Sequence, residues 1–159
     1  MKIVVVGCGK IGQSVVASLV SEGQDVVAVD LESDTVTQMT NVYDVIGVCG
    51  NGVDCEVLRE AGVSEAELLV AVTGSDESNM LCCLFAKRLG AKHTIARIRN
   101  PEYNDQLYFM QDELGLSMVI NPEFAAAREM YLSLQFPDAM KIENFSGGRV
   151  TLIEIKIDK

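Results

Sequence analysis

The sequence predicts an α/β fold of the Rossmann type, a doubly wound parallel sheet of six strands with helices on its faces. Short β-branched runs alternate with longer helical patterns, which is typical of parallel βαβ units. A glycine-rich turn, Gly7–Gly12, follows the first strand at once and opens the first helix. Right-handed crossovers favour the strand order 3-2-1-4-5-6, with a ligand crevice between strands one and four.

Each predicted element has its own signal. Strands covered on both faces are nearly unbroken apolar runs, and the predicted strands are 2–6, 25–30, 45–49, 68–72, 94–98 and 117–120. The intervening helices are predicted at 11–22, 33–41, 54–61, 76–89 and 101–114. Gly23 and Gly90 are placed to end the first and fourth helices. Asn100 followed by Pro101 is typical of an N-cap with proline at the first helical position.

The pattern changes after strand six. Asn121-Pro122 predicts the start of a helix over 122–136, which Pro137 ends. Its apolar residues cover more than the single stripe of a surface helix; they are Phe124, Ala125, Ala126, Ala127, Met130, Tyr131, Leu132, Leu134 and Phe136. We therefore expect one face to dock on the sheet and the remainder to meet a second subunit.

The last residues predict a β-hairpin, with strands 140–145 and 149–157 and a turn at Ser146-Gly147-Gly148. An isolated hairpin is marginal in water. We expect this hairpin either to pair with another chain or to belong to a longer one.

Composition excludes several classes of function. The 159 residues carry a formal net charge of −10, which argues against a nucleic-acid partner and against attachment to an anionic membrane. No stretch approaches the ~20 apolar residues that span a bilayer, so no direct membrane insertion is expected. Five cysteines without a C-x-x-C pair, beside one histidine, give little support for a zinc site. They favour a cytoplasmic protein with reduced thiols, mostly buried.

The glycine-rich turn has the residues that a diphosphate site needs. Gly7 permits the tight turn, Gly9 lets the backbone approach the diphosphate, and Gly12 lets the helix lie close to the strand. The helix N-terminus supplies N–H donors and a partial positive charge for the anion. The alternative is a turn-forming glycine set without a ligand.

An acid closes the second predicted strand. Asp30 lies 18 residues beyond Gly12, near the ~20-residue spacing of the acid that binds ribose in dinucleotide sites. A carboxylate there accepts hydrogen bonds from both ribose hydroxyls and repels a 2′-phosphate. Leu31 and Glu32 follow, with no arginine for that phosphate, so NADP is disfavoured. Alternatively, Asp30 caps the next helix.

Other residues near the crevice have open interpretations. Lys10 could meet a phosphate or be solvated. Asn51 and Gly52, after strand three, could close over the adenine, or form a plain turn. Thr73 and Gly74, after strand four, are placed to line the ligand on the other side of the crevice.

The residues that follow have structural alternatives as well. Ser75 or Asp76 could cap the fourth helix. Arg97 and Arg99 alternate along strand five and share a face, where they could serve an anion in the crevice, a subunit contact or solubility.

A catalytic set is not evident. A dehydrogenase needs a proton donor or acceptor beside the hydride path, usually on a substrate domain, for which the chain has no room. His93 falls between helix four and strand five and is interpreted as a loop residue. We therefore favour a module that senses a nucleotide over an enzyme. The alternatives are the cofactor domain of an NAD-dependent oxidoreductase lacking its substrate domain, and a scaffold with a vestigial site.

Several further motifs resemble one family closely. Besides the glycine turn and Asp30, they are Gly50-Asn51-Gly52, Leu58-x-x-Ala61-Gly62-Val63, Ala71-Val72-Thr73-x-x-Asp76-Glu77-x-Asn79, Ala86-Lys87 and Ile95-Ala96-Arg97-Ile98-Arg99-Asn100-Pro101-Glu102-Tyr103. The chain resembles the N-terminal RCK (TrkA-N) domain of the Trk/Ktr bacterial potassium-uptake regulators over residues 1–136, including the crossover helix 122–136. Residues 137–159 resemble the linker and first strands of that family's C-terminal domain, truncated here.

The resemblance implies a cytoplasmic regulatory subunit, peripheral to the inner face of the membrane. Its domains pair into homodimers or rings through the helix at 122–136. They bind NAD(H), or ATP and ADP, and gate an integral-membrane potassium transporter. In that family Lys10 occupies a position where some relatives have a phosphate-reading arginine, and Glu123 matches a divalent-cation ligand shared between subunits. NAD(H) is the expected cofactor.

The predicted nucleotide site follows from these motifs. Its residues are Gly7, Gly9, Lys10, Ile11, Gly12, Asp30, Leu31, Asn51, Gly52, Thr73, Gly74, Asp76 and Arg97.

Overall fold

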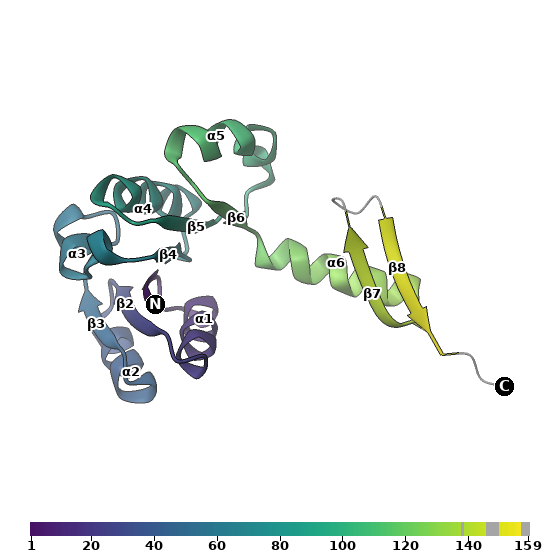
Figure 1. Ribbon diagram of the computed structural model, residues 1–159, viewed down its shortest axis with the longest axis horizontal. Coiled ribbons are helices and arrows are strands. Elements are labelled where there is room, and N and C mark those ends of the chain that lie inside the picture. The colour runs from purple at the N-terminus through teal and green to yellow at the C-terminus, as the bar shows by residue number, and fades with distance from the viewer. Residues whose placement is uncertain (138, 146–149, 157–159) are drawn as a thin grey trace. The chain divides into compact units, whose positions relative to one another are not determined.

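The chain forms two compact units. The computed structural model describes residues 1–137, 139–145 and 150–156, and the contacts divide the chain into Met1–Ile120 and Asn121–Lys159 (Figure 1). The helix predicted at 122–136 falls in the second unit, whereas the sequence grouped it with the nucleotide-binding domain. The domain boundary at residue 136 remains a prediction.

The first unit is built on a six-stranded sheet in the order β3-β2-β1-β4-β5-β6, with every neighbouring pair parallel. Its strands are β1 (Lys2–Val6), β2 (Asp25–Asp30), β3 (Ile46–Cys49), β4 (Leu68–Ala71), β5 (His93–Arg97) and β6 (Met118–Ile120). The predicted fold class and strand order are confirmed. The order reverses between β1 and β4, so the carboxyl ends of these two strands flank the switch point, where open α/β sheets bind ligands.

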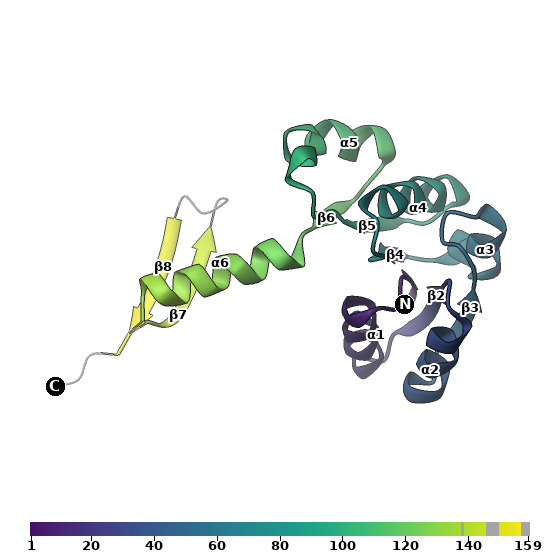
Figure 2. The same ribbon diagram turned by 180° about the vertical axis from the view of Figure 1, so that it is seen from behind.

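Helices cover both faces of this sheet (Figures 1 and 2). They are α1 (Lys10–Ser21), α2 (Ser33–Tyr43), α3 (Cys55–Glu60), α4 (Asp76–Leu89) and α5 (Leu107–Leu114). Side chains of β1 alternate between two cores: Ile3 and Val5 pack with α1 and α2, and Val4 and Val6 pack with α3 and α4. Burial on both faces explains why β1 is apolar throughout.

Two local predictions were wrong, and one element was missed. The segment predicted as one helix over 101–114 begins as a 3₁₀ helix, η2 (Pro101–Gln106), and continues as α5; 3₁₀ turns are common at α-helix ends, and apolar spacing does not reveal them. A second 3₁₀ helix, η1 (Val63–Glu65), was not predicted. His93, interpreted as a loop residue, begins β5, where it pairs with Leu68.

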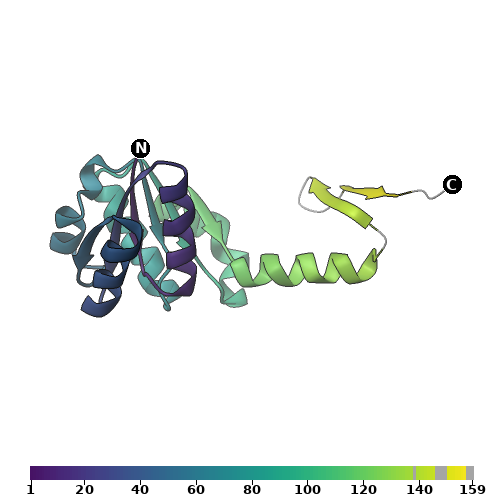
Figure 3. The same cartoon turned by 90° about the horizontal axis from the view of Figure 1, so that it is seen from below.

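The second unit consists of a helix and a two-stranded antiparallel sheet (Figure 3). Asn121 caps α6 (Pro122–Gln135) by accepting the N–H of Phe124, as expected from Asn-Pro. The sheet pairs β7 (Ala139–Phe145) with β8 (Val150–Ile155). The predicted turn at 146–148 and Ile157 lie outside the described residues.

A close backbone contact joins α1 to the turn after β1. A Cβ atom placed on Gly12 would lie 1.9 Å from the carbonyl oxygen of Gly7, whereas one placed on Gly9 would meet no atom within 4 Å. Packing therefore requires glycine at position 12 but not at position 9.

We expect Gly12→Ala to lower the free energy of unfolding by about 1–3 kcal/mol, the usual cost of overpacking. Urea denaturation measures this loss, with Gly9→Ala as the matched control. Equal stabilities of the two variants would contradict the contact.

Candidate nucleotide site

The turn after β1 lies against the loop after β4, residues 72–75, called the β4 loop below. Gly7 has a φ of +93°, which favours glycine, and its N–H donates to the carbonyl of Val29 at 2.8 Å. A Cβ atom on Gly7 would come within 2.7 Å of the backbone nitrogen of Thr73. The turn is therefore fixed to β2 on one side and touches the β4 loop on the other.

The N-terminus of α1 is the predicted source of phosphate donors. Gly9 is its N-cap, has no side chain to cap the helix, and is followed by no acidic residue in the first turn. The N–H groups at this end therefore retain their partial positive charge. Since the space before Gly9 is open and its φ is −65°, neither packing nor backbone conformation requires glycine there. Glycine is itself a common N-cap residue, and close approach of a ligand to Gly9 remains a prediction.

Asp30 lies directly beside the glycine turn. Its Oδ2 accepts the N–H of Cys8 at 2.6 Å, and its Oδ1 accepts the N–H of Glu32 at 3.0 Å. The N-cap of α2 is Glu32, so Asp30 itself is not the helix cap. Each carboxylate oxygen has two lone pairs, and capacity for ribose hydroxyls remains. Burial, with a smaller contribution from Asp30, raises the pKa of the Cys8 thiol to about 12, so Cys8 stays a neutral core residue.

The β4 loop lies on the other side of the switch point. Ser75 is the N-cap of α4, because its Oγ accepts the N–H of Ser78 at 3.1 Å. The cap is therefore Ser75 and not Asp76. A Cβ atom on Gly74 would meet nothing within 4 Å. Gly74 and Gly9 thus both face open space, from opposite sides of the switch point.

Asp76 joins the β4 loop to the chain after β5. Its buried Oδ2 accepts the N–H groups of Arg99 and Asn100, each at 2.8 Å, and its Oδ1 accepts Nε of Arg99 at 3.3 Å. Burial alone would raise the pKa of Asp76, but these bonds and the guanidinium outweigh it and hold the pKa below its usual value. A contact of Asp76 with the nucleotide remains a prediction.

The two arginines occupy different settings. Arg97 ends β5, is 9% exposed, and its Nη1 donates to the carbonyl of Thr73 at 3.4 Å. Burial lowers the pKa of Arg97, and nearby Arg99 lowers it further. Arg99 lies beyond the strand, so the expectation that both share a face of β5 was wrong. Its Nη2 donates to the carbonyl of Gly74.

Two predicted site residues have structural explanations. The Oδ1 of Asn51 accepts the N–H of Val53 at 3.2 Å, which makes a local turn. A Cβ atom on Gly52 would lie 2.2 Å from Cγ1 of Val6, so packing onto β1 requires this glycine. Their contact with an adenine remains a prediction.

Three others lie around the turn. Lys10 is exposed at the start of α1, and Ile11 is half-buried against the core beneath α1. Leu31 is 66% exposed directly after Asp30, where an apolar side chain is free to cover a base.

Asn79 was not among the predicted site residues. It is fully buried in α4 and bonded to both Thr73 and Arg97. The motif containing it was noted, but an amide in a helix carries no signal of such long-range partners.

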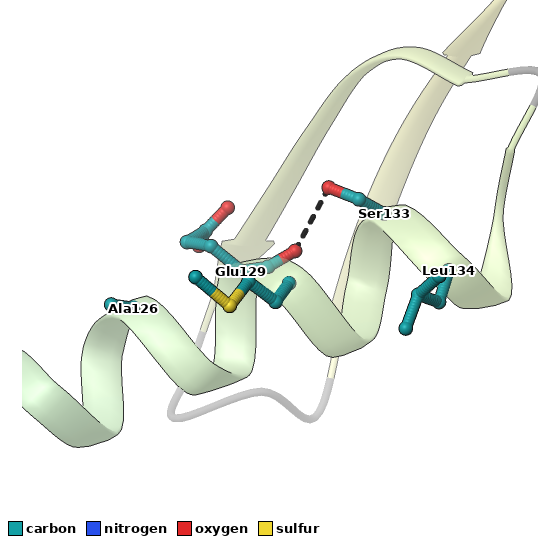
Figure 4. A pocket seen from close by; sticks show the side chains of 5 residues that line it. Ala126, Glu129, Ser133 and Leu134 are labelled. Atoms are coloured by element: carbon teal, nitrogen blue, oxygen red, sulfur yellow. Dashed lines mark hydrogen bonds between the residues drawn. The ribbon is translucent and has the colours of Figure 1, made fainter.

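The predicted metal ligand Glu123 lies in the first turn of α6. In the part of the chain that the structure describes, no three His, Cys, Asp or Glu side chains gather at one point. A shared site would need a second copy, and this assignment remains a prediction. An apolar pocket farther along α6 is lined by Ala126, Glu129, Met130, Ser133 and Leu134 (Figure 4).

Residues 3–122 match the model of the TrkA-N domain family. The chain belongs to this family. It is 36% identical over 157 residues to the Trk system potassium uptake protein TrkA homolog of Archaeoglobus fulgidus. That alignment covers 99% of this chain but 36% of the relative, so the chain spans about a third of that protein's length.

Solved structures share the fold. The TrkA-N domain of the inner membrane protein ybaL from Escherichia coli has a TM-score of 0.73 at 22% identity, covering 84% of this chain and 96% of that one. The GsuK channel bound to NAD has a TM-score of 0.64 at 24% identity, over 75% and 21%. The Shewanella denitrificans Kef CTD in AMP-bound form has a TM-score of 0.68 at 18% identity, over 85% and 82%. These identities establish the fold alone.

Among the helices in residues 1–137, none has the length and apolar character needed to cross a bilayer.

We expect Asp76→Asn to lower the free energy of unfolding by about 2 kcal/mol at pH 7, because hydrogen bonds to a charged acceptor are each worth ~1.5–3 kcal/mol. The folded-state pKa of Asp76 is lowered, so its stabilisation is complete above about pH 4 and is lost as the pH falls through the folded pKa. Urea denaturation from pH 7 downward should therefore show the gap between the two proteins narrowing below about pH 4. A gap that stays constant wherever both proteins are folded would refute this role.

Proposed function

We propose that this chain is the nucleotide-sensing domain of a cytoplasmic regulatory subunit for potassium uptake. It binds NAD(H) between the glycine turn and the β4 loop. Gly9 and the N-terminus of α1 hold the diphosphate, and Asp30 holds the adenosine ribose.

One observation carries the proposal. The carboxylate of Asp30 accepts the N–H of Cys8 at 2.6 Å. This bond brings the proposed ribose-binding carboxylate next to the open space at Gly9, where backbone N–H groups would bind phosphate. A nucleoside diphosphate has its ribose and its phosphates in that same order. ADP and ATP share these groups with NAD and fit the same residues. NADP is disfavoured because its 2′-phosphate would meet the Asp30 carboxylate.

Potassium uptake is supported by the TrkA relative, and NAD by a structural neighbour bound to NAD. Because the chain spans about a third of that relative, partnership with a membrane potassium transporter and its gating belong to the proposal. The transport relative favours a sensor over the cofactor domain of an oxidoreductase.

Pairing of subunits through α6 is the second part of the proposal. Phe124, Met130 and Tyr131 are each more than 60% exposed, and Leu134 is 83% exposed. Apolar exposure of this extent on one helix is typical of an interaction surface. A second copy would cover it in a homodimer or ring.

Calorimetric titration with NAD, NADH, ADP, ATP and NADP tests the nucleotide site. We expect Asp30→Ala to weaken binding of the preferred nucleotide by about 10–100-fold, since the charged acceptor of two hydroxyl bonds is removed. Asp34→Ala, an exposed acid in the first turn of α2, is the control and should bind normally. Failure of the folded wild-type chain to bind any of the five, or equal binding by both variants, would refute the site.

Light scattering tests the α6 interface. We expect the wild-type chain to associate at tens of micromolar and Leu134→Glu to shift it toward monomer, because a charge would be buried in the interface. Val42→Glu, at an exposed apolar position of α2, should leave association unchanged. A monomeric wild-type chain would exclude this interface.

A further inference from the structure

A single buried amide fixes the β4 loop. Asn79 is 0% exposed, and its Oδ1 accepts both the N–H of Thr73 at 2.8 Å and the hydroxyl of Thr73 at 2.7 Å. Its Nδ2 donates to the carbonyl of Arg97 at 2.8 Å and to that of Thr73 at 3.4 Å. An amide is suited to this place because it both accepts and donates.

These bonds use the polar groups of Thr73 inside the protein. Its hydroxyl bonds Asn79, lies 3.2 Å from the carbonyl of Ser75 and accepts the Ser75 N–H at 3.3 Å. Its carbonyl accepts from Asn79 and from Arg97. The hydroxyl of Thr73 therefore serves the loop, and the next residue, Gly74, is exposed. A contact of Thr73 with the nucleotide remains a prediction.

Gly74 has no internal reason to be glycine. Its φ is not in the left-handed region, and a Cβ atom there would meet nothing within 4 Å. Its carbonyl accepts a hydrogen bond from Nη2 of Arg99, which orients the peptide group. The open space in front of Gly74 is thus bounded by a loop that Asn79 and Arg99 hold in place.

This loop lies on the far side of the switch point from Asp30. β2, which carries Asp30, and β4 flank β1 on opposite sides. Dinucleotides bind across this point in doubly wound sheets. A mononucleotide held by Asp30 and Gly9 would make its contacts on the β2 side, and the second nucleoside of a dinucleotide would extend toward Gly74.

We propose that Asn79 is a positioning residue for the second half of a dinucleotide, and that through Gly74 it sets the preference of this site for dinucleotides over mononucleotides. The inference rests on the proposed nucleotide site. It differs from a purely structural role, because loss of general support for α4 would weaken every nucleotide alike.

Titration with NAD and with AMP separates these roles. We expect Asn79→Ala to weaken NAD binding by at least about tenfold, which corresponds to ~1.4 kcal/mol, and to leave AMP binding within about twofold of wild type. Asn41→Ala, an exposed asparagine in α2, is the matched control and should bind both as wild type does.

Two further substitutions keep the test decisive if Asn79→Ala does not fold. Gly74→Val introduces a side chain into open space, so it should fold and selectively weaken NAD binding. Thr73→Val removes the hydroxyl bonded to Asn79 and should also selectively weaken NAD binding. Thr73→Ser retains the hydroxyl and should bind NAD as wild type does.

Each outcome decides the proposal. Selective loss of NAD binding in Asn79→Ala and Thr73→Val, with normal NAD binding by Thr73→Ser, supports the proposal. Equal losses for NAD and AMP, or no loss for either, overturn it while leaving the nucleotide site intact. A wild-type chain that binds AMP but not NAD overturns it in the same way, and one that binds neither overturns the proposed function as well.

Discussion

The backbone of Gly7 lies so close to the backbone of Thr73 that no side chain fits between them. This contact connects the ends of β1 and β4, the two strands at which the sheet changes direction. The N–H of Gly7 bonds β2 at the same time, so three strand ends share one turn. Everything proposed for the site depends on this arrangement, because it brings a ribose acid, phosphate donors and a second loop to one edge of the sheet.

Because the chain is acidic overall, an anion would have to be attracted by nearby partial charges and not by the net charge. The chain carries a formal net charge of −10, and Asp30 and Asp76 both belong to the predicted nucleotide site. Both carboxylates accept backbone N–H groups of neighbouring loops. Backbone donors at the N-terminus of α1 can therefore act on a diphosphate without a cluster of lysines or arginines.

Much of the fold was predictable, because its signals are local. Apolar runs mark strands buried on both faces, and the handedness of crossovers leaves few strand orders. One role within the glycine motif was also predicted: Gly12 is required by close packing.

The interactions that were missed join residues distant in sequence. Asn79 bonds Arg97, 18 residues away, and Asp76 bonds Arg99, 23 residues away. A buried amide and a buried acid in a helix resemble solvent-facing ones until the fold supplies their partners. Gly52 shows the converse, because a glycine expected at a ligand is also required by Val6 of β1.

The same long-range bonds bear on how a sensor could transmit its signal. Asn79 and Asp76 lie one turn apart in α4 and bond the end of β5 and the residues after it. Tyr103 of η2 donates to Glu77 at 2.8 Å and adds a third link. A ligand in contact with Gly74 would therefore act on a loop that hydrogen bonds connect to the end of β5 and to η2. It changes a conformational ratio only by binding two positions of that loop unequally, about 1.4 kcal/mol for each factor of ten.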